Sequence, residues 1–285
     1  MARDGQLAVL FPGQGSQTAA MRELVELLRP DLIELAADVV GDDPFERVEE
    51  GTRWAQPAIF CAALAGWETL RGELRPAAFA GHSLGEITAL AAARALGVAD
   101  ALRLVAARGR FMHEADDRGG MLAVRGSAGD VEETAARHAL ALANDNSPEQ
   151  VVLSGAEEGL EAALSELRER KLRAKRLPVR GAFHSPAMQP AVPRFRALLE
   201  QVELREPAVP VFSCVTAAPF DDVRARLLQA LTSPVRWLDV LRGLRALGAE
   251  RFVETGPGKV LTGLVRKSLD GVEAESPVRL EAAHA

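Results

Sequence analysis

A serine between two glycines, in the run Gly81-His82-Ser83-Leu84-Gly85, most constrains what this chain can fold into. Such a G-x-S-x-G pattern is typical of a strand that turns sharply into a helix, with glycines where a side chain would clash. Ser83 is then expected at the bend, near free N–H groups of a helix N-terminus, which stabilise negative charge. The pattern makes Ser83 a candidate nucleophile, although so short a pattern also occurs in proteins without this activity.

Composition excludes several classes of function. The 285 residues are 48% hydrophobic and 26% charged, which is enough material for a buried core. No apolar run approaches the ~20 residues of a membrane span, and a net charge of −6 argues against general nucleic-acid binding. The two cysteines, Cys61 and Cys214, are expected to be reduced core residues rather than a disulfide or a metal pair. We therefore expect a soluble cytoplasmic protein without a membrane, nucleic-acid or metal partner.

Outside residues 119–180 the chain alternates between strand-like and helix-like segments, which indicates an α/β protein. The glycine-rich loop Pro12–Gln17 follows the first expected strand and offers backbone N–H groups to a developing oxyanion. The turn at 256–259, which contains Pro257, lacks the spacing of a phosphate-binding loop and is expected to be structural. The expected elements are strands at Leu7–Phe11, ending near Gly81, near Val209–Val215 and at Arg251–Glu254, with helices at Pro57–Leu70 and from an Asp100 N-cap to about Ala115.

Residues 119–180 have a different pattern, which we interpret as an inserted unit. The predicted order is β-α-β-β-α-β, the split unit of a small sheet with two helices on one face. The expected strands are Met121–Val124, Ala139–Ala143, Gln150–Leu153 and Leu177–Phe183, and the expected helices are Gly129–His138 and Glu158–Lys171.

A nucleophilic serine needs a base, and His184 is the best placed of the five histidines. It is expected at the end of the strand Leu177–Phe183, before Ser185 as an N-cap and a proline at the first helical position. Sheet enzymes place catalytic groups at such corners. The alternative is that His184 only caps a buried turn. His82 is expected to point away from Ser83, because neighbouring strand side chains face opposite sides; the remaining histidines are His113 and His138 on expected helices and His284 near the end.

Arg108 lies in the middle of an apolar face of the helix expected from Asp100. Each helical residue advances by about 100°, which sends Arg103 and Arg110 to the opposite side. A guanidinium on an apolar face must have a partner, either a core Asp or Glu or a ligand in a cavity. A planar guanidinium binds a carboxylate in bidentate fashion, and with a reactive serine expected nearby we favour a substrate carboxylate. The apolar residues of this face are Leu104, Val105, Phe111 and Met112.

A series of short motifs runs in order nearly from end to end of the chain. The motifs are FPGQGSQ at 11–17, Gln56-Pro57, GHSLGE at 81–86, RGRFM at 108–112, NSP at 146–148, AFHSPAM at 182–188, SPVRW at 233–237 and ETGPGKVLTGL at 254–264. In this the chain resembles the malonyl-CoA:acyl-carrier-protein transacylases and the acyltransferase domains of polyketide and fatty acid synthases. The resemblance implies an α/β-hydrolase-like large subdomain with a parallel sheet (residues 1–118 and 181–285) and an inserted ferredoxin-like small subdomain (residues 119–180).

The resemblance also implies roles for particular residues. Ser83 would be the nucleophile and His184 the base, and the backbone N–H groups of Gln14 and Leu84 would form the oxyanion hole. Arg108 would bind the substrate carboxylate. The family orients its histidine with a main-chain carbonyl rather than an acid; that carbonyl usually belongs to a Gln, and Ala230 stands at this position here.

The implied reaction loads malonyl groups from malonyl-CoA onto the phosphopantetheine thiol of an acyl carrier protein, for fatty acid or polyketide synthesis, by a ping-pong scheme without a bound cofactor. Leu84 and Phe183 resemble malonyl-type members, and Phe183 would crowd an α-methyl group. A basic run that includes Arg173, Lys175 and Arg176 is either a solvated helix end or a docking patch for an acidic carrier. We expect a monomer. The alternatives are an acyl hydrolase of the same fold and the transacylase that charges malonate decarboxylase.

Overall fold

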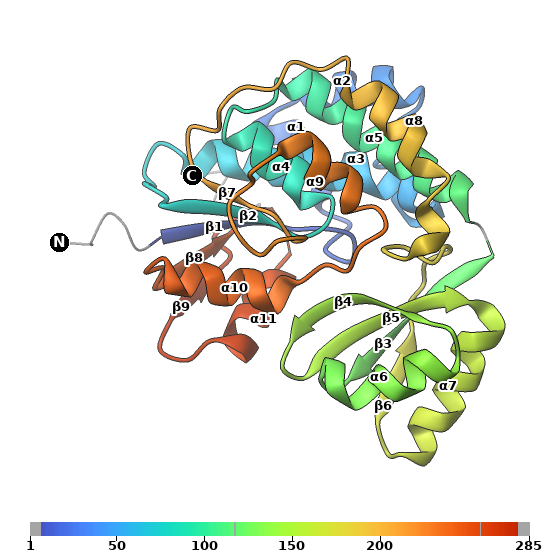
Figure 1. The fold of residues 1–285 in the computed structure, drawn as a ribbon. Helices are drawn as coiled ribbons and strands as arrows, with labels where there is room; N and C mark the ends of the chain where they lie inside the picture. Colours follow the sequence, from blue (N-terminus) through green and yellow to red (C-terminus); the bar gives the residue numbers. More distant parts are fainter. Residues whose placement is uncertain (1–6, 117, 257, 279–285) are drawn as a thin grey trace.

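A five-stranded sheet forms the centre of the larger part of the molecule in the computed structural model, which describes residues 7–116, 118–256 and 258–278 (Figure 1). The strand order is β7-β2-β1-β8-β9, and every neighbouring pair is parallel. The prediction of an α/β protein is thereby confirmed. The strands are β1 (Leu7–Phe11), β2 (Ala78–Gly81), β7 (Val211–Phe212), β8 (Arg251–Glu254) and β9 (Glu273–Glu275).

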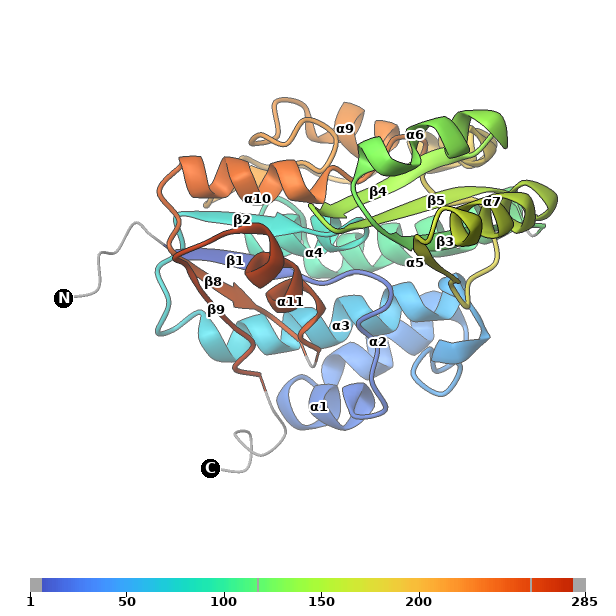
Figure 2. The same cartoon turned by 90° about the horizontal axis from the view of Figure 1, so that it is seen from below.

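Helices cover both faces of this sheet (Figures 1 and 2). Along β1, Val9 and Phe11 belong to the apolar cluster shared with α3, α4 and α5, whereas Ala8 and Leu10 belong to the cluster shared with α10 and α11. Strands buried on both faces are typical of parallel sheets. The helices are α1 (Met21–Leu28), α2 (Asp31–Val40), α3 (Thr52–Leu70), α4 (Gly85–Ala92), α5 (Val98–Ala115), α8 (Ala191–Leu199), α9 (Val223–Gln229), α10 (Trp237–Ala246) and α11 (Val260–Ser268), with 3-10 turns η1 (Val48–Glu50) and η2 (Pro186–Met188). None of the helices that the structure describes is long and apolar enough to cross a membrane.

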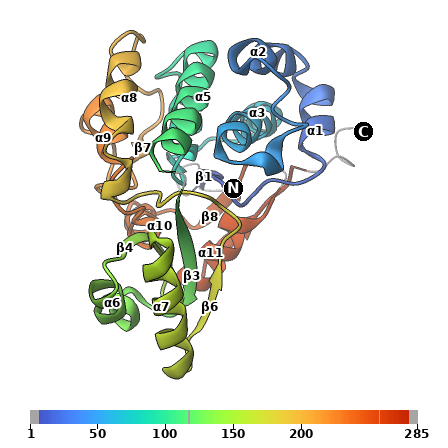
Figure 3. The same cartoon turned by 90° about the vertical axis from the view of Figure 1, so that its right-hand side faces the viewer.

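A second, antiparallel sheet lies below the first in Figures 1 and 3 and has the order β4-β5-β3-β6. Two helices pack on one of its faces, and Met121 and Val152 on the other face join the main apolar cluster. The predicted β-α-β-β-α-β order is confirmed. The elements are β3 (Gly119–Arg125), α6 (Ala128–Arg137), β4 (Ala141–Ser147), β5 (Gln150–Ala156), α7 (Glu157–Glu169) and β6 (Arg173–Arg176).

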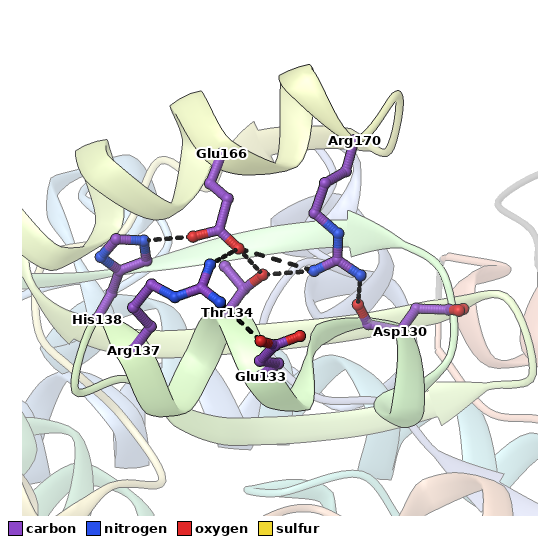
Figure 4. A network of polar contacts seen from close by, with 7 residues as sticks. All are labelled: Asp130, Glu133, Thr134, Arg137, His138, Glu166 and Arg170. Atoms are coloured by element: carbon purple, nitrogen blue, oxygen red, sulfur yellow. Dashed lines mark hydrogen bonds and ion pairs between the residues drawn. The ribbon is translucent and has the colours of Figure 1, made fainter.

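Glu166 ties α7 to α6 on the outer side of the second sheet (Figure 4). Its carboxylate accepts hydrogen bonds from Thr134 Oγ1 at 2.7 Å and from His138 Nε2 at 2.8 Å, and it pairs with Arg137 Nη1 at 2.8 Å. These donors, led by the Thr134 hydroxyl, lower the pKa of Glu166 to about 2. The helices α6 and α7 are therefore joined by a cluster of hydrogen bonds and ion pairs centred on Glu166, which we call the Glu166 cluster.

Strand β4 joins the small sheet to the segment that precedes α10. Its Ala143 carbonyl accepts from Val235 N–H at 2.8 Å, and its Asp145 N–H donates to the Val235 carbonyl at 2.9 Å. We expected this strand to end at Ala143 and the next one to begin at Gln150. The expected end is wrong, because pairing with β5 and with Val235 keeps the polar segment after Ala143 extended through Ser147.

The expected strand at Leu177–Phe183 does not form. The last strand of the small sheet is β6, which ends at Arg176. Pro178 has no N–H for a strand ladder, and Gly181 has a φ of +113°, outside the extended region. The segment that leads to His184 is therefore irregular.

Two helix starts also differ from the expectation. Helix α3 begins at Thr52, so Pro57 lies inside it rather than at its start. Helix α5 begins at Val98 after Gly97, and Asp100 is not its N-cap but lies in its first turn. An acidic side chain is favourable there, because the helix N-terminus carries partial positive charge.

Candidate active site

Ser83 lies at the bend between β2 and α4, with its backbone in the left-handed region at a φ of 54°. A Cβ on Gly81 would lie 1.9 Å from the Gly85 carbonyl carbon, and one on Gly85 would lie 2.2 Å from the Phe11 carbonyl oxygen. Both flanking positions therefore accept only glycine. A non-glycine residue held in this backbone region costs about 1–3 kcal/mol and is typical of functional sites.

The imidazole of His184 contacts the hydroxyl of Ser83. Its Nε2 lies 2.8 Å from Ser83 Oγ, and its Nδ1 lies 2.9 Å from the Ala230 carbonyl oxygen. That carbonyl accepts the Nδ1–H, which leaves Nε2 free to accept the serine proton. His184 also has a positive φ, 58°. The N-cap of η2 is Ser185, not His184.

The environment of His184 keeps its imidazole neutral. Burial, together with the positive charge of Arg108, lowers the pKa of His184 from 6.5 to about 3. A neutral imidazole is the form that takes a proton. His82 makes a different contact, with its Nε2 2.8 Å from Asn146 Oδ1, and is not aimed at the serine.

Arg108 is buried on α5, at 3% exposure, and its guanidinium reaches the nucleophile. Nη2 donates to Ser83 Oγ at 3.0 Å and Nη1 to Gln56 Oε1 at 2.8 Å. Among the residues that the structure describes, no carboxylate oxygen comes within 4.0 Å of this guanidinium. Burial lowers its pKa only to about 10, so the group is a cation at neutral pH. No direct salt bridge to a core carboxylate therefore forms, and the nearby buried Glu86 acts on the guanidinium only through longer-range charge interaction.

The loop after β1 packs directly against the serine bend. A Cβ on Gly13 would lie 2.4 Å from the His82 carbonyl oxygen. Within residues 7–116, 118–256 and 258–278, neither the Gln14 N–H nor the Leu84 N–H donates a hydrogen bond to the protein. Two backbone donors near the nucleophile are thus available for a ligand.

A cavity of about 250 Å³ joins these groups and lies between the two sheets. Its walls come from the 12–17 loop, from Ser83, His184 and Arg108, and from the inner face of the small sheet. Phe183, 5% exposed, is part of the wall beside His184. The small sheet contributes Met121, Ala123, Asn144, Asn146 and Val152.

The basic residues of β6 divide between two faces. Arg173 and Lys175 are exposed and border a second hollow, together with Arg125 and Lys267. This hollow shares Ala123 and Gln150 with the cavity. Arg176 is instead paired with Glu157, because alternate strand residues face opposite sides.

Several residues of the site were not predicted as such. Gln56 accepts a hydrogen bond from Arg108, and Asn146 is hydrogen-bonded to His82. Lys267 is a further basic residue in the wall of the second hollow. Gln56 did carry a signal, because it is a polar residue in the apolar run that becomes α3. Pro257 and His284 lie outside the described residues.

Comparisons with known proteins agree with one another. Residues 33–280 match the family model described as acyl transferase domain. The chain is 36% identical to the malonyl CoA-acyl carrier protein transacylase of Salmonella typhimurium, over 98% of each chain. It is 40% identical to the polyketide biosynthesis protein ThaF of Burkholderia thailandensis, where the match covers 92% of this chain but only 24% of that longer protein.

Solved structures give the same result. A malonyl-CoA:acyl carrier protein transacylase from Xanthomonas oryzae superposes with a TM-score of 0.90 at 34% identity, over 98% of this chain and 97% of that one. The acyltransferase domain of the second module of the salinomycin polyketide synthase gives a TM-score of 0.87 at 34% identity, over 97% and 70%.

Proposed function

The chain belongs to the acyl transferase domain family, and on this premise we propose that it transfers malonyl groups from malonyl-CoA to an acyl carrier protein through an ester on Ser83. The relatives at 36% identity over almost their whole length are named for that activity. Two further relatives are named for polyketide synthesis, so the proposed transfer could serve fatty acid or polyketide synthesis.

In the first half-reaction His184 Nε2 takes the proton of Ser83 Oγ while Oγ attacks the thioester carbonyl carbon. The tetrahedral oxyanion is stabilised by the backbone N–H groups of Gln14 and Leu84. The carbon–sulfur bond then breaks, and His184 returns the proton to the departing coenzyme A thiolate. In the second half-reaction the carrier's phosphopantetheine thiol attacks the ester, and the same proton transfers run in the opposite direction.

The buried cation at the nucleophile is the observation that carries the malonyl assignment. Arg108 lies 3.0 Å from Ser83 Oγ, and no described carboxylate forms an ion pair with it. Its hydrogen bonds to Gln56 and Ser83 and the longer-range charge of Glu86 do not replace a direct ion pair. A planar guanidinium and a carboxylate form two parallel hydrogen bonds. The free carboxylate of a malonyl group supplies that partner, and an unsubstituted acyl chain does not.

Two further residues adapt this site to its task. Ala230 orients His184 through its main-chain carbonyl, a role that does not depend on the side chain. Phe183 narrows the cavity beside the base and disfavours an α-methyl group on the acyl chain. One methyl group is worth only about 1–3 kcal/mol, so we expect a preference rather than strict exclusion.

The basic hollow is proposed as the docking site of the acidic carrier. Arg173, Lys175, Arg125 and Lys267 surround it, and Glu149 is its one acidic wall residue among those described. Its shared wall with the cavity would lead a phosphopantetheine arm toward Ser83. Arg176, committed to Glu157, contributes to this surface less than its neighbours. We expect the protein to act in the cytoplasm, as a monomer and without a bound cofactor.

The test is a two-step transfer followed by intact-protein mass spectrometry. The protein is first loaded with malonyl-CoA and freed of excess donor, and an acyl carrier protein with its phosphopantetheine arm is then added. We expect the malonyl mass to leave the protein and appear on the carrier. Loss of the adduct to water at the same rate with and without carrier would instead identify an acyl hydrolase.

A further inference from the structure

Four side chains form a continuous line of hydrogen bonds from Arg108 to the loop after β1. Arg108 Nη1 donates to Gln56 Oε1, Gln56 Nε2 donates to Thr52 Oγ1, and Thr52 Oγ1 donates to Gln14 Oε1. Each of the three bonds is 2.8 Å long. The line therefore joins the cation that we assign to substrate recognition to the residue whose N–H we assign to the oxyanion hole.

Thr52 is the central link because of where α3 begins. It is the first residue of that helix, is 3% exposed, and lies one turn before Gln56 on the same face. A Cβ on Gly109 would lie 2.8 Å from the Thr52 carbonyl oxygen, so glycine at this position lets α3 approach α5 next to Arg108. The positions of Thr52, Gln56 and Arg108 relative to one another are therefore fixed by the packing of α3 against α5.

The direction of donation is the same at all three bonds. The positive end is the guanidinium, and each successive group donates away from it, so the bonds polarise one another. A buried hydroxyl at the centre both accepts and donates, and only Thr or Ser offers this at so short a side-chain length. Without that hydroxyl, Gln56 Nε2 and Gln14 Oε1 would lose their mutual connection.

We propose that Thr52 is a positioning residue that couples carboxylate binding at Arg108 to the placement of Gln14 beside Ser83. This inference rests on the proposed function. A carboxylate that draws Arg108 away from Ser83 Oγ leaves its Nη1 bond to Gln56 in place, and the line then holds the Gln14 backbone where the oxyanion forms. A donor that lacks the carboxylate makes no contact with Arg108, so its acylation depends less on Thr52 than malonyl transfer does.

The experiment measures the single-turnover rate of malonyl transfer from malonyl-CoA to the protein in a double-mutant cycle. Thr52→Val keeps the shape but removes the hydroxyl, and we expect a rate about tenfold lower, because the bonds on both sides are lost. Thr52→Ser keeps the hydroxyl and should restore the rate to within about twofold of the original. In an Arg108→Ala background, where the line is already broken, Thr52→Val should change the rate by less than about twofold.

Thr88→Val is the matched control. Thr88 is a fully buried threonine of α4 whose hydroxyl has no hydrogen-bond partner among the described residues. The same chemical change there should leave the malonyl transfer rate unaltered. If Thr52→Val does not fold, Gln14→Met is used instead, because it removes the last hydrogen bond of the line. We expect it to lower the malonyl transfer rate about tenfold in the original protein and less than about twofold in Arg108→Ala.

The outcomes separate this inference from the proposed function. An original protein that is never malonylated would refute the proposed function itself. A malonylated original protein with an unchanged rate in Thr52→Val would refute only the coupling. An equal loss with Arg108 present and absent would also refute it, because Thr52 would then serve the fold alone.

Discussion

The guanidinium of Arg108 donates a hydrogen bond to the hydroxyl of Ser83 across 3.0 Å. Arg108 lies on α5 and Ser83 at the bend before α4, and both line the same cavity. In a malonyl thioester only one carbon separates the carboxylate from the reacting carbonyl. A contact this short therefore matches the length of the substrate, since a carboxylate on Arg108 brings the carbonyl carbon to Ser83.

Removal of the Arg108 charge should abolish the preference for malonyl donors. In Arg108→Ala we expect the ratio of malonyl to acetyl transfer rates to fall at least about thirtyfold, the cost of losing one partner of a buried ion pair. Both rates are measured by single-turnover acylation from the two coenzyme A thioesters. Arg110→Ala, on the exposed side of the same helix, is the control and should keep the original ratio. An unchanged ratio in Arg108→Ala would contradict the assignment of the carboxylate site.

The acylation rate should not fall through the pH range in which an ordinary histidine titrates. Because the pKa of His184 is lowered from 6.5 to about 3, the base stays neutral at pH values well below 6.5. Protonation, which would remove the base, sets in only as the pH approaches 3. We expect a flat single-turnover rate between about pH 5 and 8.

A second group near the site titrates in that range and must be controlled. Burial raises the pKa of Glu86 to about 7, and its carboxylate accepts a hydrogen bond from Cys214 N–H. The profile is therefore measured in parallel in Glu86→Gln, which removes this titration. A fall with a midpoint near 6.5 in both proteins would mean that His184 is not held neutral by its surroundings.

Helix α5 shows what the sequence predicts well. The 100° helical step placed Arg108 on an apolar face, and the structure finds it buried at 3% exposure with Ser83 in reach. The serine bend is equally local, because Gly81 and Gly85 are required by contacts within a few residues and with β1. Such features depend on neighbours in the chain and on regular geometry, which a sequence pattern records.

His184 was predicted as the base because a strand was expected to end just before it, and that part of the prediction is wrong. The strand expected before it does not form, because of Pro178 and Gly181, and its place at the site comes from Ala230 on a distant segment. Thr52 and Lys267 were not predicted as parts of the site, and Gln56 appeared only within the motif Gln56-Pro57. Their roles arise where helices far apart in the chain meet, and no local periodicity carries that information.

Reversal of charge at the basic hollow should weaken transfer to the carrier. In the double variant Arg173→Glu and Lys175→Glu we expect a higher KM for the acyl carrier protein and a smaller dependence on ionic strength, because steering by surface charge is lost. Transfer to free pantetheine, which has no carrier protein, should be unaffected. Arg168→Glu makes the same kind of change on α7, outside the hollow, and should behave like the original. Equal KM values for all three proteins would exclude docking at this surface.

The Glu166 cluster should stabilise the folded protein without changing the rate of malonyl transfer. Because the pKa of Glu166 is lowered from 4.5 to about 2, its stabilising contribution is present above pH 4.5 and is lost as the pH falls through 2. We expect Glu166→Gln to unfold at a lower urea concentration at neutral pH, and the difference from the original to shrink as the pH falls below 4.5.

Glu169→Gln, an exposed position on the same helix, is the control for that experiment and should change neither quantity. Malonyl transfer rates of both variants should equal that of the original, since Glu166 lies on the face of the small sheet away from the cavity. A constant difference in urea midpoint across the pH range would contradict the role given to the ionised carboxylate.

The most direct test of the central claim is the intact mass of the protein after exposure to malonyl-CoA, compared between the original and Ser83→Ala. The Ala side chain removes only the hydroxyl that lies 2.8 Å from His184 Nε2, and the cavity otherwise stays as it is. We expect one malonyl group on the original protein and none on Ser83→Ala. An undiminished malonyl adduct on Ser83→Ala would show that the ester forms elsewhere and that Ser83 is not the nucleophile.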